Sequence, residues 1–304
     1  MNSKCIENFE DFVIEVQNAL EQFYGEDAEV YVREILKNNG VKLRGLCIIH
    51  PGGGPFPTIY LEPFYEEYRR CREFGSVIQK LIHHLEQSSD NLQLDLTLFT
   101  DYEKAKDRIM YKLVNYQNNE QLLMGVPHME FLNLAIVFYV QIFQEELFNG
   151  TILIRDEHMK NWGVTLEQLY EMARINTERA NPVKLLNMKD LMEELQCKHP
   201  ELPDVSGLDV SMYVITNAMQ RFGASVILYE GTLRKLEDYV GERYAVIPSS
   251  IHEMIVIPVE NYEQTKDLAD MIQEINELEV APEEVLSDYA YYYEHEAGIV
   301  MAAE

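Results

Sequence analysis

The sequence predicts an α+β fold with mainly antiparallel sheets, flanking helices and two lobes. Some segments repeat apolar residues at helical spacing, and others are short runs of β-branched residues. Helices and strands do not alternate regularly along the chain, which disfavours a doubly wound parallel sheet. Polar turns separate several strand pairs, and such turns favour antiparallel hairpins.

The chain is long enough for two domains. Its 304 residues and hydrophobic fraction of 47% can fill one large core or two ordinary ones. Residues 197–207 contain two prolines and a glycine, which interrupt regular structure and mark a boundary. We therefore expect an N-terminal lobe over residues 1–200 and a C-terminal lobe over residues 205–304.

The first elements are expected to be a helix and a hairpin. Apolar residues recur three and four apart over residues 9–23, which predicts a helix that ends at Gly25. Residues 28–36 and 41–49 are rich in β-branched side chains and predict two strands. The turn between them, Lys37-Asn38-Asn39-Gly40, contains residues that tolerate a positive φ, so we expect a tight hairpin.

The middle of the chain predicts helices, then a strand pair, then another helix. Residues 61–85 and 102–116 show helical spacing. Residues 131–143 are too uniformly apolar to show a period; we expect a strand paired with residues 151–154, with a buried helix as the alternative. A Thr and a Gln three residues apart form a capping box that begins a helix over residues 165–179.

The C-terminal third mixes short strands and helices. Its tyrosine-rich end predicts a strand packed on the core, with a partner-binding patch as the alternative, because Tyr is common at interfaces. In chain order we expect strands at 212–216 and 224–228, a helix at 232–240, strands at 243–247 and 254–258, a helix with Leu268, Met271, Ile272, Ile275 and Leu278 on one face, and the tyrosine strand with Tyr289, Tyr291, Tyr292 and Tyr293.

The chain is strongly acidic, with a formal charge of −27 from 52 acidic and 25 basic residues. From Glu260 to the end, Lys266 is the only Lys or Arg against thirteen carboxylates. Such a surface repels a phosphate backbone, so direct binding to nucleic acid is not expected. It can instead attract a basic protein partner or imitate the charge of nucleic acid.

Membrane, metal and cofactor sites are not expected. The longest apolar run, residues 134–140, is too short to span a bilayer, and no apolar signal core opens the chain, so we expect a cytoplasmic protein. The cysteines are single and scattered, which fits neither a disulfide framework nor a zinc site. The motif His-Glu-x-x-His is absent, and the glycine triplet 52–54 lacks the Gly-Lys-Ser/Thr of a phosphate-binding loop.

The best site candidate is a polar run between two apolar strands, Ser249, Ser250, His252 and Glu253. In an extended chain Ser250 and His252 lie on one face, which makes a hydrolase pair geometrically possible. Alternatively, Pro248 ends a strand and the serine hydroxyls satisfy turn amides.

Other polar residues near element ends could join the same pocket or cap their own elements. These candidate binding residues are Asn176, Thr177 and Asn217, and the tyrosine strand adds Tyr291 and Tyr292.

Several short runs together resemble a known family. They are Lys37-Asn38-Asn39-Gly40-Val41, Pro57-Thr58-Ile59-Tyr60-Leu61-Glu62, the segment from Trp162 to Ala173 with Asn176-Thr177, Tyr213-Val214-Ile215-Thr216-Asn217, Gly223-Ala224, Ile247-Pro248-Ser249-Ser250-Ile251-His252-Glu253 and Leu286-Ser287-Asp288. Their order and spacing resemble the domain of unknown function 5688 family, over nearly the whole chain. The resemblance implies an intracellular bacterial protein of the clostridial kind, and it carries no activity or ligand to transfer.

Three functions follow as hypotheses. The first is a cytoplasmic protein with a regulatory or accessory role that binds a protein partner, with its acidic C-terminal lobe and tyrosines as the recognition surface. The second is a hydrolase or small-ligand-binding enzyme that uses a pocket at Ser249–Glu253, assisted by Asn176 or Asn217. The third is an acidic mimic of nucleic acid.

Overall fold

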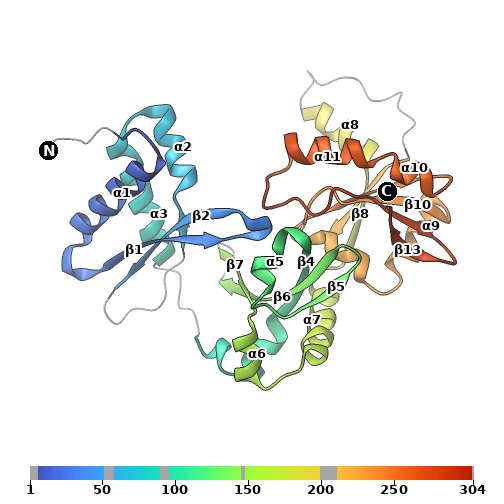
Figure 1. Cartoon of the computed structure of the whole chain (residues 1–304), viewed down its shortest axis with the longest axis horizontal. Helices are drawn as coiled ribbons and strands as arrows, with labels where there is room; N and C mark the ends of the chain where they lie inside the picture. Colours follow the sequence, from blue (N-terminus) through green and yellow to red (C-terminus); the bar gives the residue numbers. More distant parts are fainter. Residues whose placement is uncertain (1–5, 51–57, 90–95, 145–147, 199–210, 303–304) are drawn as a thin grey trace. The chain divides into compact units, whose positions relative to one another are not determined.

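The computed structural model describes residues 6–50, 58–89, 96–144, 148–198 and 211–302 (Figure 1). Three antiparallel sheets and their flanking helices confirm the α+β class. The chain forms two compact units: Met1–Lys37, Val41–Leu96 and Gln144–Phe148 make up the first, and the remaining residues make up the second. The boundary predicted near residue 200 lies outside the described residues, so the two-lobe division stays a prediction. The glycine triplet 52–54 also lies outside them.

The first unit confirms the predicted opening helix and hairpin. Asn8 caps the first helix by accepting a hydrogen bond from the Asp11 amide, and Gly25 follows its last turn. The predicted helix at 61–85 is broken into two at Arg72, which takes a left-handed conformation with φ of 57°. The elements are α1 (Phe9–Tyr24), β1 (Glu29–Leu36), β2 (Lys42–Ile49), β3 (Ile59–Tyr60), α2 (Glu62–Cys71) and α3 (Phe74–Ser89).

A four-stranded sheet follows, in the order β4-β6-β5 with β7 also paired to β6. The strand predicted at 131–143 is confirmed, whereas the helix predicted at 102–116 is wrong. Tyr102–Ala105 is a single helical turn and Lys106–Arg108 a 3₁₀ turn, whereas Ile109–Asn115 is the strand β4. Nearly all of β4 is buried, so no amphipathic period distinguishes strand from helix there. The elements are α4 (Tyr102–Ala105), β4 (Ile109–Asn115), α5 (Glu120–Leu123), β5 (His128–Phe131), β6 (Leu134–Gln144) and β7 (Phe148–Leu153).

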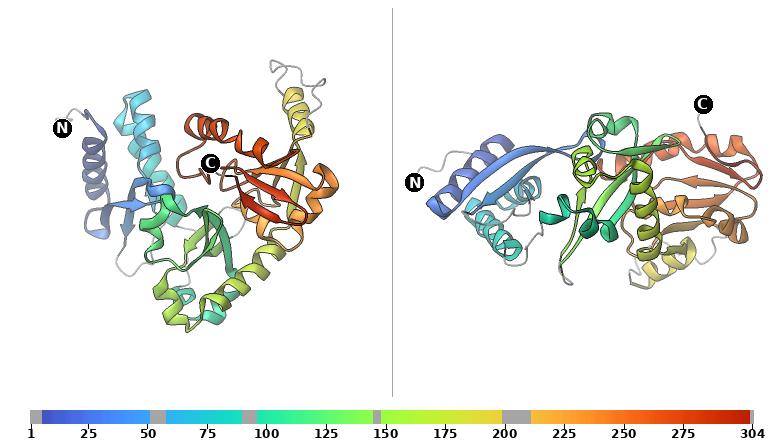
Figure 2. Two further views of the ribbon diagram at one scale, coloured as in Figure 1. Left: turned by 45° about the vertical axis from the view of Figure 1, so that its right-hand side comes forward. Right: turned by 90° about the horizontal axis from the view of Figure 1, so that it is seen from below.

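A six-stranded sheet in the order β13-β12-β10-β11-β9-β8 makes up much of the second unit (Figure 2). Its central hairpin pairs Val246 with Val256, which confirms the two predicted apolar strands. The strands are β8 (Val183–Asn187), β9 (Tyr213–Asn217), β10 (Arg243–Ile247), β11 (Met254–Pro258), β12 (Tyr291–Glu294) and β13 (Gly298–Met301).

Helices pack on both faces of this sheet. Side chains of α7 and α9 join Val246 and Val256 in the main core, while Ile272 of α11 packs with Ile247 on the opposite face. The helix predicted at 165–179 is confirmed with its capping box between Thr165 and Gln168. The helices are α6 (Asp156–Trp162), α7 (Leu166–Ala180), α8 (Met188–Lys198), α9 (Thr232–Val240), α10 (Tyr262–Lys266) and α11 (Ala269–Glu279).

The strand predicted at 224–228 is wrong. Gly223–Leu228 forms a 3₁₀ helix, η6, with buried residues from Gly223 to Ile227. Its backbone bonds locally, as in the hydrogen bond from the Tyr229 amide to the Val226 carbonyl oxygen. The apolar run 224–228 is therefore buried as a 3₁₀ helix and not as a strand.

Within the part of the chain that is described, none of the helices combines the length and the apolar character that crossing a bilayer requires.

Two tyrosines in the main core differ in how their hydroxyl groups are satisfied. Tyr111 of β4 is fully buried, and its hydroxyl has no hydrogen-bond partner among the described residues. Burial raises its pKa, so the group stays protonated. Tyr229, whose ring centroid lies 6.4 Å from that of Tyr111, donates its hydroxyl hydrogen to the Asn181 carbonyl oxygen at 3.0 Å.

The substitution Tyr111→Phe should raise the free energy of unfolding by about 1 kcal/mol, because it removes a buried hydroxyl that has lost water without gaining a partner. Tyr229→Phe is the matched control and should lower it by about 1 kcal/mol, since it leaves a buried carbonyl unpaired. Urea unfolding followed by circular dichroism measures both. A Tyr111→Phe protein as destabilised as Tyr229→Phe would contradict this account of Tyr111.

Candidate functional site

The polar run predicted as a site forms the loop between β10 and β11. The Ser250 amide donates to the Glu253 carbonyl oxygen at 3.2 Å, and the His252 amide donates to the Ser250 hydroxyl oxygen at 3.0 Å. Ser250 therefore closes the turn with its own side chain. The side chains of Ser249 and Glu253 make no hydrogen bond or ion pair within the described ranges.

Both ring nitrogens of His252 have partners. Nδ1 accepts a hydrogen bond from the Phe222 amide at 3.1 Å, and Nε2 lies 3.3 Å from Oε1 of Glu284. Since Nδ1 is an acceptor, the proton of the neutral ring sits on Nε2 and faces the Glu284 carboxylate. The ring also stacks on Phe222 with an interplanar angle of 13°. The Ser250 hydroxyl meets the His252 amide and not the ring, so no Ser–His nucleophile pair is formed.

The backbone of the same loop binds three other segments. The Ile251 amide donates to the Glu284 carbonyl oxygen at 2.8 Å, and the Thr216 hydroxyl donates to the His252 carbonyl oxygen at 2.8 Å. The Ile251 carbonyl oxygen accepts from the Ala224 amide. These bonds give the loop a structural part in holding β9, η6 and the segment around residue 284 together.

Residues 284–288, which we call the anchor segment, have neither helical nor strand structure. Side-chain amides supply much of their backbone pairing: Asn39 donates to the Val285 carbonyl oxygen, Asn115 to that of Leu286 and Asn276 to that of Ser287. Asn133 donates to the Ser287 hydroxyl oxygen at 2.9 Å. Buried irregular backbone needs such partners, and here asparagines provide them.

Asn217, Asn176 and Thr177 are all buried and all bind backbone. The Asn217 side chain makes two hydrogen bonds to the Arg221 backbone. Its oxygen accepts from the Arg221 amide, and its nitrogen donates to the Arg221 carbonyl oxygen. Asn176 donates to the carbonyl oxygens of Lys106 and Ile109, which fixes the start of β4. Among the described residues no hydrogen bond joins Asn176 or Thr177 to the Ser249–Glu253 loop.

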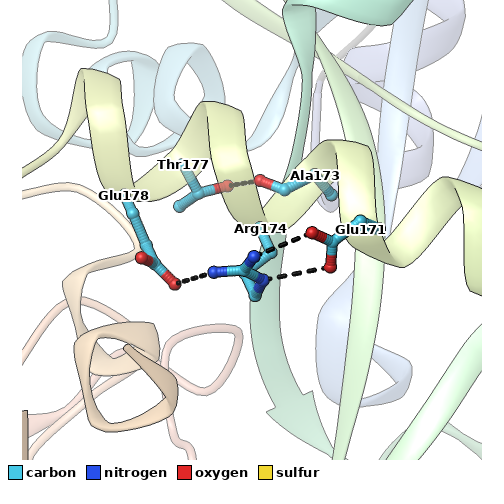
Figure 3. Close-up of polar contacts among 5 residues, drawn as sticks. All are labelled: Glu171, Ala173, Arg174, Thr177 and Glu178. Atoms are coloured by element: carbon cyan, nitrogen blue, oxygen red, sulfur yellow. Dashed lines mark hydrogen bonds and ion pairs between the residues drawn. The ribbon is translucent and has the colours of Figure 1, made fainter. Parts of the chain in front are cut away.

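Figure 3 shows the surroundings of Thr177 on α7. Its hydroxyl donates to the Ala173 carbonyl oxygen at 2.6 Å and accepts from the amide of Tyr111, so it ties α7 to β4. Arg174, on the outer side of the helix, binds Glu171 and Glu178 and its guanidinium pKa is raised by them. Pairs of this kind on a solvent-accessible helix face contribute little to stability.

Tyr291 and Tyr292 are buried in β12, where they do not present a recognition surface. Tyr291 has no exposed area and donates its hydroxyl hydrogen to Oδ1 of Asn133 at 2.8 Å. Tyr292 packs edge to face on Tyr262 of α10. The tyrosines therefore act in the core, as the strand interpretation of this segment expects.

The apolar face predicted for residues 268–278 is only partly buried. Ile272 is 3% exposed, whereas Met271 is 45% exposed, Ile275 46% and Leu278 71%. These three lie at positions i, i+4 and i+7, so they form one stripe along α11, which we call the α11 stripe. The sequence predicted a helix with these residues on one face, and the structure shows that part of this face is exposed.

Within the described residues no three His, Cys, Asp or Glu side chains gather in a way that could hold a metal ion. Cys47 and Cys71 are free thiols, and Cys71 is exposed.

The substitution Gly223→Ala should lower the free energy of unfolding by at least about 2 kcal/mol. A Cβ there would lie 2.1 Å from Oγ1 of Thr216 and 2.5 Å from the His252 carbonyl oxygen, and much of this surface is backbone that cannot move alone. The control Gly125→Ala places its Cβ where nothing lies within 4 Å. Equal urea midpoints for the two variants would contradict the role of the loop as a packed junction.

Comparisons with known proteins agree with the resemblance in the sequence. Neither the curated proteins nor the solved structures contain a match to this chain. One family model matches residues 9–295, which covers both compact units. The chain therefore belongs to the family of unknown function DUF5688.

Proposed function

We propose that this protein acts by binding a basic, amphipathic segment of a partner protein on the α11 stripe. The observation that carries the proposal is the exposure of Met271, Ile275 and Leu278 along one side of a single helix. Single exposed apolar residues are ordinary, but a contiguous apolar stripe rimmed by polar residues is typical of an interaction site. A partner helix can bury such a stripe with its own apolar face.

The charges around the stripe specify the chemistry of the partner. Helix α11 contains four carboxylates, Asp270, Glu274, Glu277 and Glu279, and no Lys or Arg. Carboxylates at the rim steer a basic partner toward the stripe and repel an acidic one. A second copy of this chain would present the same acidic rim to itself, so charge disfavours a symmetric dimer through α11.

The wider role is part of the same proposal. The scattered single cysteines support a reducing, cytoplasmic location, and partner binding suits a regulatory or accessory role in a bacterial cell. Because Tyr291 and Tyr292 are buried, we assign the partner-binding surface to α11 and not to the tyrosine strand. Both ring nitrogens of His252 already have partners, which argues against a hydrolase site at the Ser249–Glu253 loop.

Binding of a synthetic helix tests the proposal. A fluorescent peptide of leucines and lysines at helical spacing should bind the full chain, and its affinity should fall as NaCl rises from about 0.05 M to about 0.5 M because rim charges are screened. The triple variant Met271→Gln, Ile275→Gln, Leu278→Gln should weaken binding at least about tenfold, since it removes the apolar contact. Fluorescence anisotropy gives both affinities.

Two controls separate the stripe from general attraction to an acidic surface. Met124 is 81% exposed outside α11, so Met124→Gln should leave the affinity unchanged. A peptide with glutamates in place of the lysines should not bind. If the triple variant binds the basic peptide as tightly as the unaltered chain does, the α11 stripe is not the docking surface.

A further inference from the structure

Glu237, Tyr293 and His295 form a hydrogen-bonded cluster that lies apart from α11. Nδ1 of His295 lies 2.9 and 2.8 Å from the two carboxylate oxygens of Glu237. The Tyr293 hydroxyl donates to Oε1 of the same carboxylate at 2.6 Å. Glu237 comes from α9, whereas Tyr293 and His295 come from β12 and the turn after it.

This cluster fixes the proton on His295. The hydrogen bonds from Tyr293 and His295 lower the pKa of Glu237, so the carboxylate is ionised and both partners donate to it. Burial and the same carboxylate raise the pKa of Tyr293 to about 12, which keeps its hydroxyl protonated. Because Nδ1 carries a hydrogen, Nε2 of the neutral ring has an open lone pair. Nε2 has no hydrogen-bond partner among the described residues.

Tyr293 and His295 line a surface hollow of about 410 Å³. Arg234 lines the same hollow, and its positive charge acts on both Glu237 and Tyr293, so the guanidinium lies near the cluster. Although carboxylates outnumber basic residues in this chain, Arg234 makes no hydrogen bond or ion pair within the described ranges. The side chains of Ile227 and Leu233 add apolar wall.

We propose that this hollow binds the phosphate group of a small phosphate monoester, with the Arg234 guanidinium on two phosphate oxygens and Nε2 of His295 on a third. A guanidinium binds phosphate through two parallel N–H donors. The third contact shares one proton: the phosphate monoanion donates its O–H to the Nε2 lone pair, or the proton moves to Nε2 and the dianion remains. No covalent bond changes in either form.

A phosphate suits the hollow better than a carboxylate does. The second ionisation of a phosphate monoester has a pKa of about 6, close to that of imidazole at about 6.5, so a proton between them is shared near neutral pH. A carboxylate is already ionised there and has no proton for the Nε2 lone pair. The other charged groups beside the imidazole are Glu237, which binds Nδ1, and Glu296, which also lines the hollow.

Ring-nitrogen NMR of the full chain tests the site. The His295 Nε2 signal should shift when inorganic phosphate or phenyl phosphate is added in about 0.15 M NaCl, where the Debye length is about 8 Å and long-range repulsion is screened. Phenyl phosphate should bind more tightly, because its ring can contact Leu233 and Ile227. Equal affinities would assign the site to inorganic phosphate, and a His295 signal that moves with neither would overturn the proposal.

Matched variants give the second readout. Arg234→Gln and His295→Gln should each weaken phenyl phosphate binding at least about tenfold, the effect of one lost charge-assisted hydrogen bond. Lys235→Gln removes a neighbouring exposed charge that does not line the hollow and should change affinity less than about twofold. Equal weakening by Arg234→Gln and Lys235→Gln would mean general charge attraction and overturn the site. Sulfate, which has no proton to share near neutral pH, should bind more weakly than phosphate.

The two proposals fail independently. Arg234 and His295 are not part of the α11 stripe, so loss of peptide binding in the α11 triple variant leaves phosphate binding unaffected. Thermal unfolding of Arg234→Gln and His295→Gln checks that both proteins fold. We expect both to fold, because Arg234 and His295 are exposed and substitutions at exposed positions usually change stability little.

Discussion

Backbone satisfaction in the anchor segment is the constraint on which much of the second unit depends. Four consecutive carbonyl oxygens, from Glu284 to Ser287, each accept a hydrogen bond, and three of the donors are asparagine side chains. The fourth donor is the Ile251 amide in the β10–β11 loop. An irregular segment with buried Leu286 and Ser287 has no ladder to pair with, so these amides replace the missing regular structure.

This arrangement explains why the most distinctive part of the sequence is not a reactive centre. The Ser249–Glu253 loop meets the anchor segment through Ile251 and His252, and it meets η6 through Ala224. Chemistry that depends on an imidazole nitrogen without a partner is better placed at His295, where Glu237 binds Nδ1 and the residue lines a hollow. The two histidines thus differ in their ring nitrogens: both nitrogens of His252 have partners, whereas only Nδ1 of His295 has one among the described residues.

Helices and strands whose apolar residues recur at a clear spacing could be predicted from the sequence. Elements whose spacing is obscured by burial in the tertiary structure could not. The first helix, the 28–49 hairpin and the β10–β11 pair follow directly from local spacing and turn residues. β4 was predicted as a helix because burial on both faces removes the alternation that identifies a strand. The exposure of Met271 and the contact of Glu237 with His295, 58 residues apart, depend on tertiary packing that no local pattern encodes.

The opposite tautomers of His252 and His295 have a chemical consequence. In His252 the lone pair is on Nδ1, where the Phe222 amide covers it, while in His295 the lone pair is on Nε2, which has no hydrogen-bond partner among the described residues. An electrophile attacks an imidazole at the nitrogen that lacks a hydrogen. The hydrogen bond from the Phe222 amide therefore shields the His252 lone pair from an electrophile, whereas the hydrogen bonds of His295 leave its lone pair uncovered among the described residues.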